Sequence, residues 1–295
     1  MTTNPTPEQL VSGLLRLLDL DSAGDDAFVG HNRADGAGRM FGGQVIAQAL
    51  VAAERTVGED RPVHSLHAYF LRTGNEAQTL DLTVLRDLDG GSFANRRVVV
   101  SQHDKPILTL VASFHRREEG PCHAAPMPDV PPPEALQTEA ELRAHYAHLL
   151  PADKREAMLR PHAIDLRPVE ARHWMGATPA EAKSHTWFRA AAPLPDDPRV
   201  HRAVLAYASD MSLLGTSMLP HGLSWLAGDV KGVSLDHALW FHDDFRADEW
   251  LLYACDSPWA GHARGFTRGA IFTRDGRQVA SVAQEGLIRP LDPKT

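Results

Sequence analysis

The sequence predicts an α+β fold made of two similar units, because one pattern of helix and strands occurs in it twice. The run from Val63 to Arg72 recurs as Val233 to His242, and strand-like segments follow both copies. A long apolar helix precedes each copy. Helices do not alternate with strands within a copy, which favours antiparallel over parallel pairing. We therefore expect an internal duplication that gives two antiparallel sheets, each wrapped around a long central helix.

The first unit begins with two helices and a strand between them. From Pro7 to Asp19 the apolar residues recur on one face, and Pro7 suits a first helical turn, so we expect a short amphipathic helix. A strand begins near Phe28. The next helix, Gly42 to Thr56, has hardly any polar face in its apolar stretch, which predicts burial on most sides.

Strands separated by turn residues complete the first unit. The strand from Val63 to Arg72 ends at Thr73-Gly74-Asn75, and Asp89-Gly90-Gly91 and His103-Asp104-Lys105-Pro106 separate the later segments. The closing strand is Ile107 to His115. Short turns at this spacing predict an antiparallel meander.

A proline-rich segment from Pro121 to Pro133 separates the two units, because Pro removes backbone donors and stiffens the chain. The charged stretches Glu134 to Leu149 and Ala152 to Arg160 are typical of connecting helices. We expect an N-terminal unit at residues 1–120, a linker with connecting helices at 121–162 and a C-terminal unit at 163–295.

The second unit repeats the pattern with additional strands at its start. Strands are expected at Ile164 to Glu170 and His185 to Pro195, before an apolar helix from His201 to Met218. The strand that begins at Val233 follows, and Gln278 to Ile288 closes the unit.

Composition excludes several classes of partner. The 295 residues, 43% of them hydrophobic, can bury a sizeable core, and a net charge of -8 argues against nucleic acid or an anionic membrane as the main partner. No apolar run reaches the roughly 18 residues of a membrane span, and the N-terminal segment lacks the pattern of a signal peptide. The two cysteines have no metal-like spacing. We expect a cytoplasmic protein.

The two copies diverge at three polar positions. Gln284 in the second closing strand corresponds to Ala112 in the first, and Ser234 corresponds to His64. The second long helix carries Asp210 within its apolar stretch, whereas the first carries no acid there. One unit has therefore kept a polar trio that the other lacks, and Asp210, Ser234 and Gln284 are candidates for chemistry.

Long motifs resemble one known family. The strings YASDMSLL, VSLDHALWFH, ARGFTRGAIFTRDGRQVASVAQEGLIR and GGQVIAQALVAA with VHSLHAYFLR are similar to the acyl-CoA thioesterase II family, the TesB-type enzymes with a double hotdog fold. The resemblance extends from about Leu14 to Arg289. It implies that Asp210, Ser234 and Gln284 form the catalytic site. Ser stands here where many relatives have Thr, so the hydroxyl remains but its rotamer is less restricted.

The chemistry of thioester hydrolysis fits these residue types. It requires a water aimed at a carbonyl carbon, a proton acceptor and donors for an oxyanion. Burial among apolar helix neighbours would raise the pKa of Asp210 and make it a better base. Ser234 and Gln284 can then orient the water. Backbone N–H groups at Gly42 and Gly43 are candidates for the oxyanion donors.

Other side chains have weaker assignments. No metal-ligand spacing appears among the sixteen histidines, and neither a metal nor a cofactor is expected. Strict alternation along VSLDHALWFH places Ser234 and His237 on opposite faces, so His237 and its counterpart His67 are interpreted as structural. His64 is a possible residue of the acyl pocket. The arginines near the third strands either bind CoA phosphates or are solvated charges: Arg96, Arg97, Arg264 and Arg268.

Three functions compete. The leading one is release of free fatty acid and CoA from an acyl-CoA substrate. An enoyl-CoA hydratase would normally use Asp and His together, and the trio contains no His. A non-catalytic acyl-CoA-binding protein would leave Asp210 without a task. The resemblance also implies a homo-oligomer.

Overall fold

The computed structural model describes residues 4–32, 38–149, 155, 159–170, 178–225 and 228–291. The first part of the chain contains α1 (Pro7–Leu18), β1 (Leu20–Gly24), β2 (Ala27–Gly30), α2 (Gly42–Glu54), β3 (Val63–Phe70), β4 (Leu80–Asp89), β5 (Phe93–Gln102) and β6 (Lys105–His115). Short helices follow as η1 (Pro133–Ala135), α3 (Glu139–His145) and η2 (Ala147–Leu149). The second part contains β7 (Ile164–Pro168), β8 (Lys183–Ala190), α5 (Pro198–Ser209), α6 (Leu213–Thr216), η3 (Leu219–His221), β9 (Val230–Ser234), β10 (Asp236–Phe241), β11 (Leu251–Gly261), β12 (Arg264–Thr273) and β13 (Gln278–Pro290).

The strands form one continuous antiparallel sheet. Their order is β1-β2-β4-β5-β6-β3-β10-β13-β12-β11-β8-β7, with β9 also paired to β13, which makes thirteen strands among the described residues. The two sets of strands join where β3 pairs with β10, for example Leu66 opposite Leu239. The prediction of an α+β fold with antiparallel strands is confirmed. The two predicted sheets are continuous with each other, because β3 pairs edge to edge with β10.

The strands of the first part are not a simple meander. β4, β5 and β6 follow one another in the sheet, but β3 pairs with β6 and not with β4. The connection at residues 71–79 is long enough to carry the chain across the intervening strands. This arrangement places β3 at the centre of the sheet, where it meets β10.

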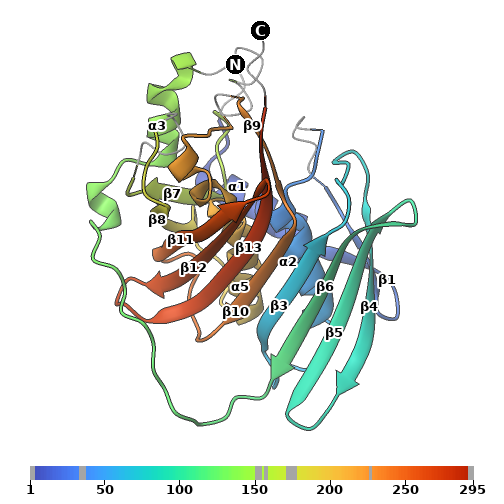
Figure 1. Ribbon diagram of the computed structural model, residues 1–295. Helices are drawn as coiled ribbons and strands as arrows, with labels where there is room; N and C mark the ends of the chain where they lie inside the picture. The colour runs from blue at the N-terminus through green and yellow to red at the C-terminus, as the bar shows by residue number, and fades with distance from the viewer. Residues whose placement is uncertain are drawn as a thin grey trace.

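Helices α2 and α5 lie together against one face of this sheet (Figure 1). α2 also contacts β3, β4, β5 and β6, and α6 contacts β11, β12 and β13. A single cluster of buried apolar residues extends through both parts and includes Leu50, Leu110, Leu205 and Ile271. α2 is almost entirely buried, as its lack of a polar face predicts. The two parts therefore share one core.

Several element boundaries differ from expectation. The hairpin strand β1 was not expected, and the apolar run from His201 to Met218 is not one helix, because α5 ends at Ser209 and the shorter α6 follows. The expected strand from Val233 is interrupted at Leu235, between β9 and β10. The expected connecting helix at Ala152 to Arg160 lies mostly outside the described residues.

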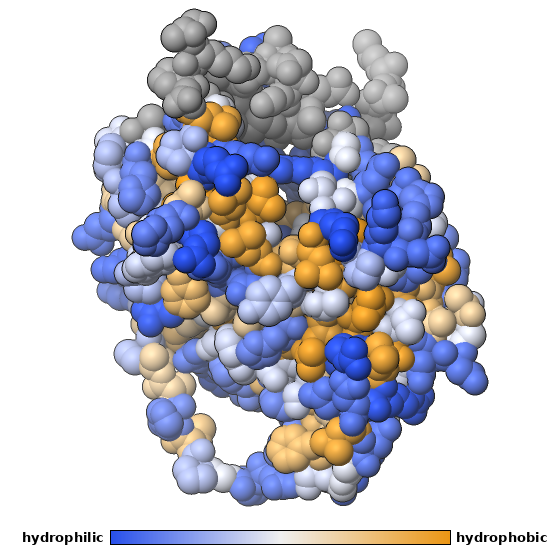
Figure 2. Space-filling view, turned by 45° about the vertical axis from the view of Figure 1, so that its right-hand side comes forward, coloured by the Kyte–Doolittle hydropathy of each residue, from blue (hydrophilic) through white to orange (hydrophobic). Residues whose placement is uncertain are grey.

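The segment after β6 runs as an extended arch to η1 and α3 (Figure 1). It stands away from the body of the molecule in Figure 2, in which apolar residues also gather toward the middle of an otherwise largely hydrophilic face. The far end of the arch is docked, since Trp187 Nε1 donates to the Pro131 carbonyl over 2.9 Å. Among the described residues, no helix combines the length and the apolar character that a membrane crossing requires.

Candidate active site

Asp210 lies where the end of one helix meets the start of another. It is the C-cap residue of α5, and the Gly43 backbone N–H at the start of α2 donates to its carboxylate. Phe41 caps α2 without a side-chain hydrogen bond, and the first turn of α2 contains no acid. The first N–H groups of α2 are therefore available to a carboxylate from elsewhere in the chain. The positive end of the α2 dipole favours the ionised form of Asp210.

Gly42 and Gly43 allow this close approach. A Cβ atom on Gly42 would lie 2.6 Å from Asp210 Oδ2 and 2.9 Å from the Phe70 ring. A Cβ atom on Gly43 would overlap the carbonyl oxygen of Tyr207. The absence of a side chain is what both positions require. The Gly43 N–H is directed at Asp210, so it is not free in this state to act as the oxyanion donor that the sequence suggested.

The sheet brings Ser234 and Gln284 to the same carboxylate. Ser234 in β9 is opposite Gly286 in β13, and Gln284 lies two residues before Gly286 on the same face. Gln284 is buried, and its Nε2–H donates to Asp210 Oδ1 over 2.7 Å. The Ser234 hydroxyl also bonds to the carboxylate of Asp210. The three residues that the sequence singled out thus lie together, from one helix end and two paired strands.

Burial is the main influence on the charge of Asp210. It raises the pKa of Asp210 from 3.8 to about 6, while hydrogen bonds from Gln284, Gly43 and Ser234 act in the opposite direction. A carboxylate with a pKa of about 6 is still mostly ionised at neutral pH and is a stronger base than an exposed Asp. Its surroundings suit a proton acceptor.

His237 is a member of this group that sequence reasoning assigned to the wrong face. Its Nδ1 lies 3.2 Å from Gln284 Nε2 and 3.9 Å from Asp210 Oδ1. The break at Leu235 explains the error, because β13 pairs with β9 and with β10 in registers that differ by one residue. The extra residue brings His237 and Ser234 to the same face. A break at Leu235 in the alternation of side chains between the two sheet faces is the sequence signal that could have placed His237 on the same face as Ser234.

Burial also fixes the charge of His237. Its side chain is fully buried, and the loss of solvation lowers its pKa from 6.5 to about 3. His237 is therefore neutral at physiological pH. The predicted counterpart His67 is different, since it is exposed and packs edge to face on Trp240.

The first part of the chain has no equivalent polar group at the matching place. Ala112, opposite to Gln284 in the duplication, is paired with Leu66 on one side and Arg96 on the other. Arg96 is buried at 1% exposure. Its donors bond to Thr56, Leu88, Asn95 and Asp89.

This arrangement corrects the assignment of Arg96 as a CoA-binding residue. A guanidinium has five N–H donors, and five hydrogen bonds within the protein occupy those of Arg96. The side chain therefore has no donor left for a phosphate. Its hydrogen bonds to Thr56 connect β5 to the segment that follows α2. Arg96 is paired with Ala112, the counterpart of Gln284.

Arg264 lies on the opposite face of the sheet from Gln284. It is paired with Leu287, an odd number of residues from Gln284, and its side chain is 45% exposed. Its Nη1 donates to Glu285 over 3.3 Å, and the guanidinium lies 5.7 Å from the Trp259 ring. A role for Arg264 in binding CoA stays a prediction. Arg97 and Arg268 are exposed and pair with Asp87 and Asp256.

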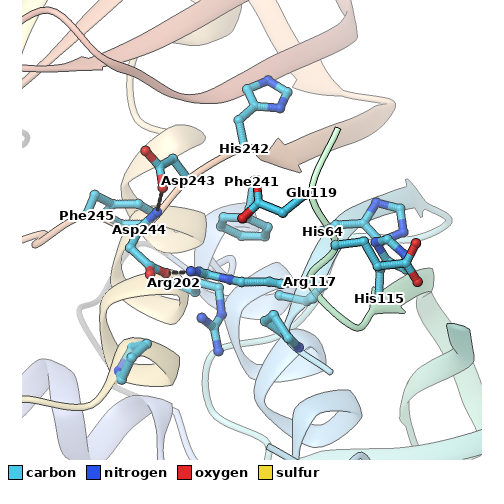
Figure 3. Close-up of a pocket in the computed structure, with 14 residues that line it drawn as sticks. His64, His115, Arg117, Glu119, Arg202, Phe241, His242, Asp243, Asp244 and Phe245 are labelled. Carbon is cyan, nitrogen blue, oxygen red and sulfur yellow. Dashed lines mark hydrogen bonds and ion pairs between the residues drawn. The ribbon is translucent and has the colours of Figure 1, made fainter. Parts of the chain in front are cut away.

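His64 lines a cavity of about 440 Å³ whose lining does not include Asp210, Ser234 or Gln284 (Figure 3). It lies near His115, with His242 and Arg117 on other walls of the same cavity. Its Nε2 is 2.9 Å from Ser113 Oγ, and burial, together with the nearby His115, lowers its pKa. The structure therefore does not bring His64 to Asp210.

Comparisons with known proteins agree with this fold. The family described as "Acyl-CoA thioesterase" matches residues 153–287, and the "Acyl-CoA thioesterase N-terminal domain" matches residues 31–115. Human acyl-coenzyme A thioesterase 8 is 41% identical over 288 residues, which are 95% of this chain and 89% of the human protein.

Solved structures give the same result. The acyl-CoA thioesterase II TesB2 from Mycobacterium marinum is 40% identical, with a TM-score of 0.77 over 95% of this chain and 99% of that chain. A hotdog-fold protein of unknown function from Alicyclobacillus acidocaldarius is 20% identical and has a TM-score of 0.74 over 94% of this chain and 98% of that chain, a likeness of fold alone.

The fold is that of hotdog-type thioesterases, with a large antiparallel sheet. The chain belongs to the acyl-CoA thioesterase family, as the motifs predicted. The enzyme class that follows is thioester hydrolase acting on acyl-CoA.

Proposed function

We propose that this protein hydrolyses acyl-CoA thioesters to free fatty acid and CoA, with a water activated by Asp210 and oriented by Ser234 and Gln284. The observation that carries the proposal is the buried Asp210 carboxylate, which faces the start of α2 and accepts a hydrogen bond from Gln284 over 2.7 Å. Burial of a carboxylate costs desolvation, and carboxylates with a pKa raised in this way cluster at functional sites.

The steps follow from the positions of these groups. Asp210 takes a proton from water while the water oxygen attacks the thioester carbonyl carbon. The resulting oxyanion would be stabilised by a backbone N–H at the start of α2 other than that of Gly43, which already donates to Asp210. The carbon–sulfur bond then breaks, and the CoA sulfur takes up the proton. Fatty acid and CoA leave, and Asp210 is again ionised.

The division of the chain into two hotdog units is part of this proposal. Residues 1–120 and 163–295 would each form one unit around a central helix, α2 and α5, with residues 121–162 between them. Contacts of α2 with β3 to β6 support this for the first unit. For the second, Tyr253 Oη–H in β11 donates to the Ser209 carbonyl at the end of α5 over 3.0 Å. Association into a homo-oligomer stays a prediction.

Release of free thiol from a series of acyl-CoA chain lengths tests the proposed activity. We expect thiol release that depends on chain length and on enzyme concentration. Binding of acyl-CoA without thiol release would favour a non-catalytic binding protein. Consumption of an enoyl-CoA without thiol release would favour a hydratase.

The pH dependence of kcat should report the ionisation of Asp210. Because the base must be deprotonated, kcat should fall as the pH decreases through about 6 and should level off above it. His237 should not contribute to this limb, since its pKa is near 3. Measurement of kcat between pH 5 and pH 9 at saturating acyl-CoA checks this. A profile that is flat through pH 6 would contradict the assignment of Asp210 as base.

Ser234→Ala and Gln284→Ala should each lower kcat by less than loss of the base does. Both side chains orient one water and one carboxylate, so the loss in the double variant should be smaller than the product of the two single losses. The cycle of kcat values for the wild type, both single variants and the double variant measures this. Full multiplicativity would show that the two groups act independently.

A further inference from the structure

A chain of hydrogen bonds continues from Gln284 to the backbone of α5. The Ser209 hydroxyl donates to the Ala206 carbonyl over 2.9 Å, so its oxygen is left to accept a hydrogen bond. His237 Nε2 lies 2.9 Å from that oxygen, and His237 Nδ1 lies 3.2 Å from Gln284 Nε2. Ser209, His237 and Gln284 are all buried. Water therefore does not compete for these bonds.

The donor and acceptor in each of these hydrogen bonds follow from the Ala206 carbonyl, which can only accept. Because the Ser209 hydroxyl donates its hydrogen to the Ala206 carbonyl, the donor in the bond between Ser209 and His237 must be His237 Nε2–H. Neutral His237 then has a bare Nδ1, which can only accept. One Gln284 Nε2–H supplies that bond, and the other donates to Asp210 Oδ1 over 2.7 Å.

The amide of Gln284 consequently has one allowed orientation. Rotation of the amide by half a turn would place its carbonyl oxygen against the lone pairs of His237 Nδ1 and Asp210 Oδ1. In the observed orientation both N–H groups are used, and Oε1 is buried without a hydrogen-bond partner among the described residues. Buried acceptors are normally hydrogen-bonded, so Gln284 Oε1 can accept a hydrogen bond from an added donor such as water.

We propose that Ser209 and His237 are positioning residues that hold the Gln284 amide with its nitrogen on Asp210 and its carbonyl oxygen toward the attacking water. The inference rests on the proposed hydrolysis of acyl-CoA at this site. A water that donates one proton to Gln284 Oε1 and the other to Asp210 is held by two acceptors, so its lone pair is directed at the substrate carbonyl. The amide thus sets the direction of the water as well as bonding to the base.

The first part of the chain provides a comparison. The motif aligns His67 with His237, but the residue paired with Ala112, the counterpart of Gln284, is Leu66, and both Leu66 and Ala112 are apolar and buried. A leucine is therefore compatible with this place in the sheet. His237→Leu removes the hydrogen bonds of His237 to Ser209 and Gln284. The leucine that replaces it is the residue type that the first part of the chain has opposite Ala112.

The test uses Ser209→Ala and His237→Leu in the full-length protein. Each variant frees the amide of Gln284 to turn, and Asp210 then loses a hydrogen bond that lowers its pKa. We expect kcat to fall about tenfold or more with KM nearly unchanged, and the acidic limb of the kcat profile to move to higher pH. The kcat of the double variant should equal that of the less active single variant, because both substitutions break the same series of hydrogen bonds.

A matched control lies nearby, between Ser281 in β13 and His242, which directly follows β10. His242 Nε2 is 2.8 Å from Ser281 Oγ, outside the Asp210 group. Ser281→Ala therefore breaks a hydrogen bond between the same residue types and should leave both kcat and the acidic limb unchanged. Thermal unfolding of all variants identifies any loss that comes from misfolding.

The tautomer of His237 gives a second measurement that does not depend on turnover. Nitrogen-15 NMR of labelled histidine should show one non-titrating ring protonated on Nε2, and Ser209→Ala should change that signal. A ring protonated on Nδ1 in the wild type, or variants that keep both the acidic limb and kcat, would overturn the proposal. If Asp210→Asn itself remains active, the proposed base is wrong, and that result is distinguishable from failure of the positioning role alone.

Discussion

Asp210→Asn should lower kcat for acyl-CoA hydrolysis by at least about a hundredfold while the protein remains folded. The substitution removes the proton acceptor and keeps the shape of the side chain, and Asn Oδ1 can still accept the hydrogen bond that Gln284 now gives to Asp210. Initial rates of thiol release at saturating substrate measure the effect. Activity within a few-fold of the wild type would remove Asp210 from the role of base.

The same variant should change how stability depends on pH. The pKa of Asp210 rises from 3.8 in the unfolded chain to about 6 in the folded one, so the folded state holds the proton more tightly. The contribution of Asp210 to stability is therefore greatest below pH 4 and declines as the pH rises through 6, by about 3 kcal/mol in all. Chemical denaturation of both proteins at pH 4, 5, 6 and 7 should show a decline that is larger in the wild type than in the variant, since Glu54, whose pKa burial raises to about 7, contributes equally to both.

Gly43→Ala should cause the second large effect, a loss of stability together with a loss of activity. The added methyl group would overlap the Tyr207 carbonyl oxygen, which belongs to the backbone of α5 and cannot rotate away. α2 and α5 would have to separate, and the Gly43 N–H would leave Asp210. We expect a fall of several degrees or more in Tm and a strong loss of kcat.

Gly91→Ala is the control for this variant. Gly91 lies in an exposed turn where an added Cβ would meet nothing within 4 Å. Its Tm and kcat should stay close to those of the wild type. An equally mild effect of Gly43→Ala would show that the contact between the two helices has more room than the structure indicates.

The grouping of Asp210, Ser234 and Gln284 could be predicted because the two copies of the duplicated pattern can be compared with each other. Comparison of Gln284 with Ala112 marks a polar residue at a position where the fold accepts an apolar one. Asp210 stands out in the same way, as an acid in a helix whose counterpart is apolar. Antiparallel pairing also followed from local signals, because short turns and alternating residues act over only a few positions.

Other features depend on contacts that no local pattern records. The pairing of β3 with β10 joins residues that lie far apart in the sequence. The partners of Arg96 include the carbonyl oxygens of Thr56 and Leu88, which lie outside β5, so its burial could not be inferred from its neighbours in β5. His237 was misplaced because a single extra residue at Leu235 reverses the faces of the residues that follow it.

The contact between Gly43 and Asp210 also bears on the order of events during folding. The acid, the hydroxyl and the amide all come from the C-terminal part of the chain, but the N–H that meets the acid comes from the N-terminal part. An intermediate in which only residues beyond the proline-rich linker have folded would possess the base without the helix start that faces it. Such an intermediate would be inactive toward acyl-CoA. Recovery of activity after dilution from denaturant should therefore coincide with the docking of α2 against α5, and not with the earlier formation of either sheet region.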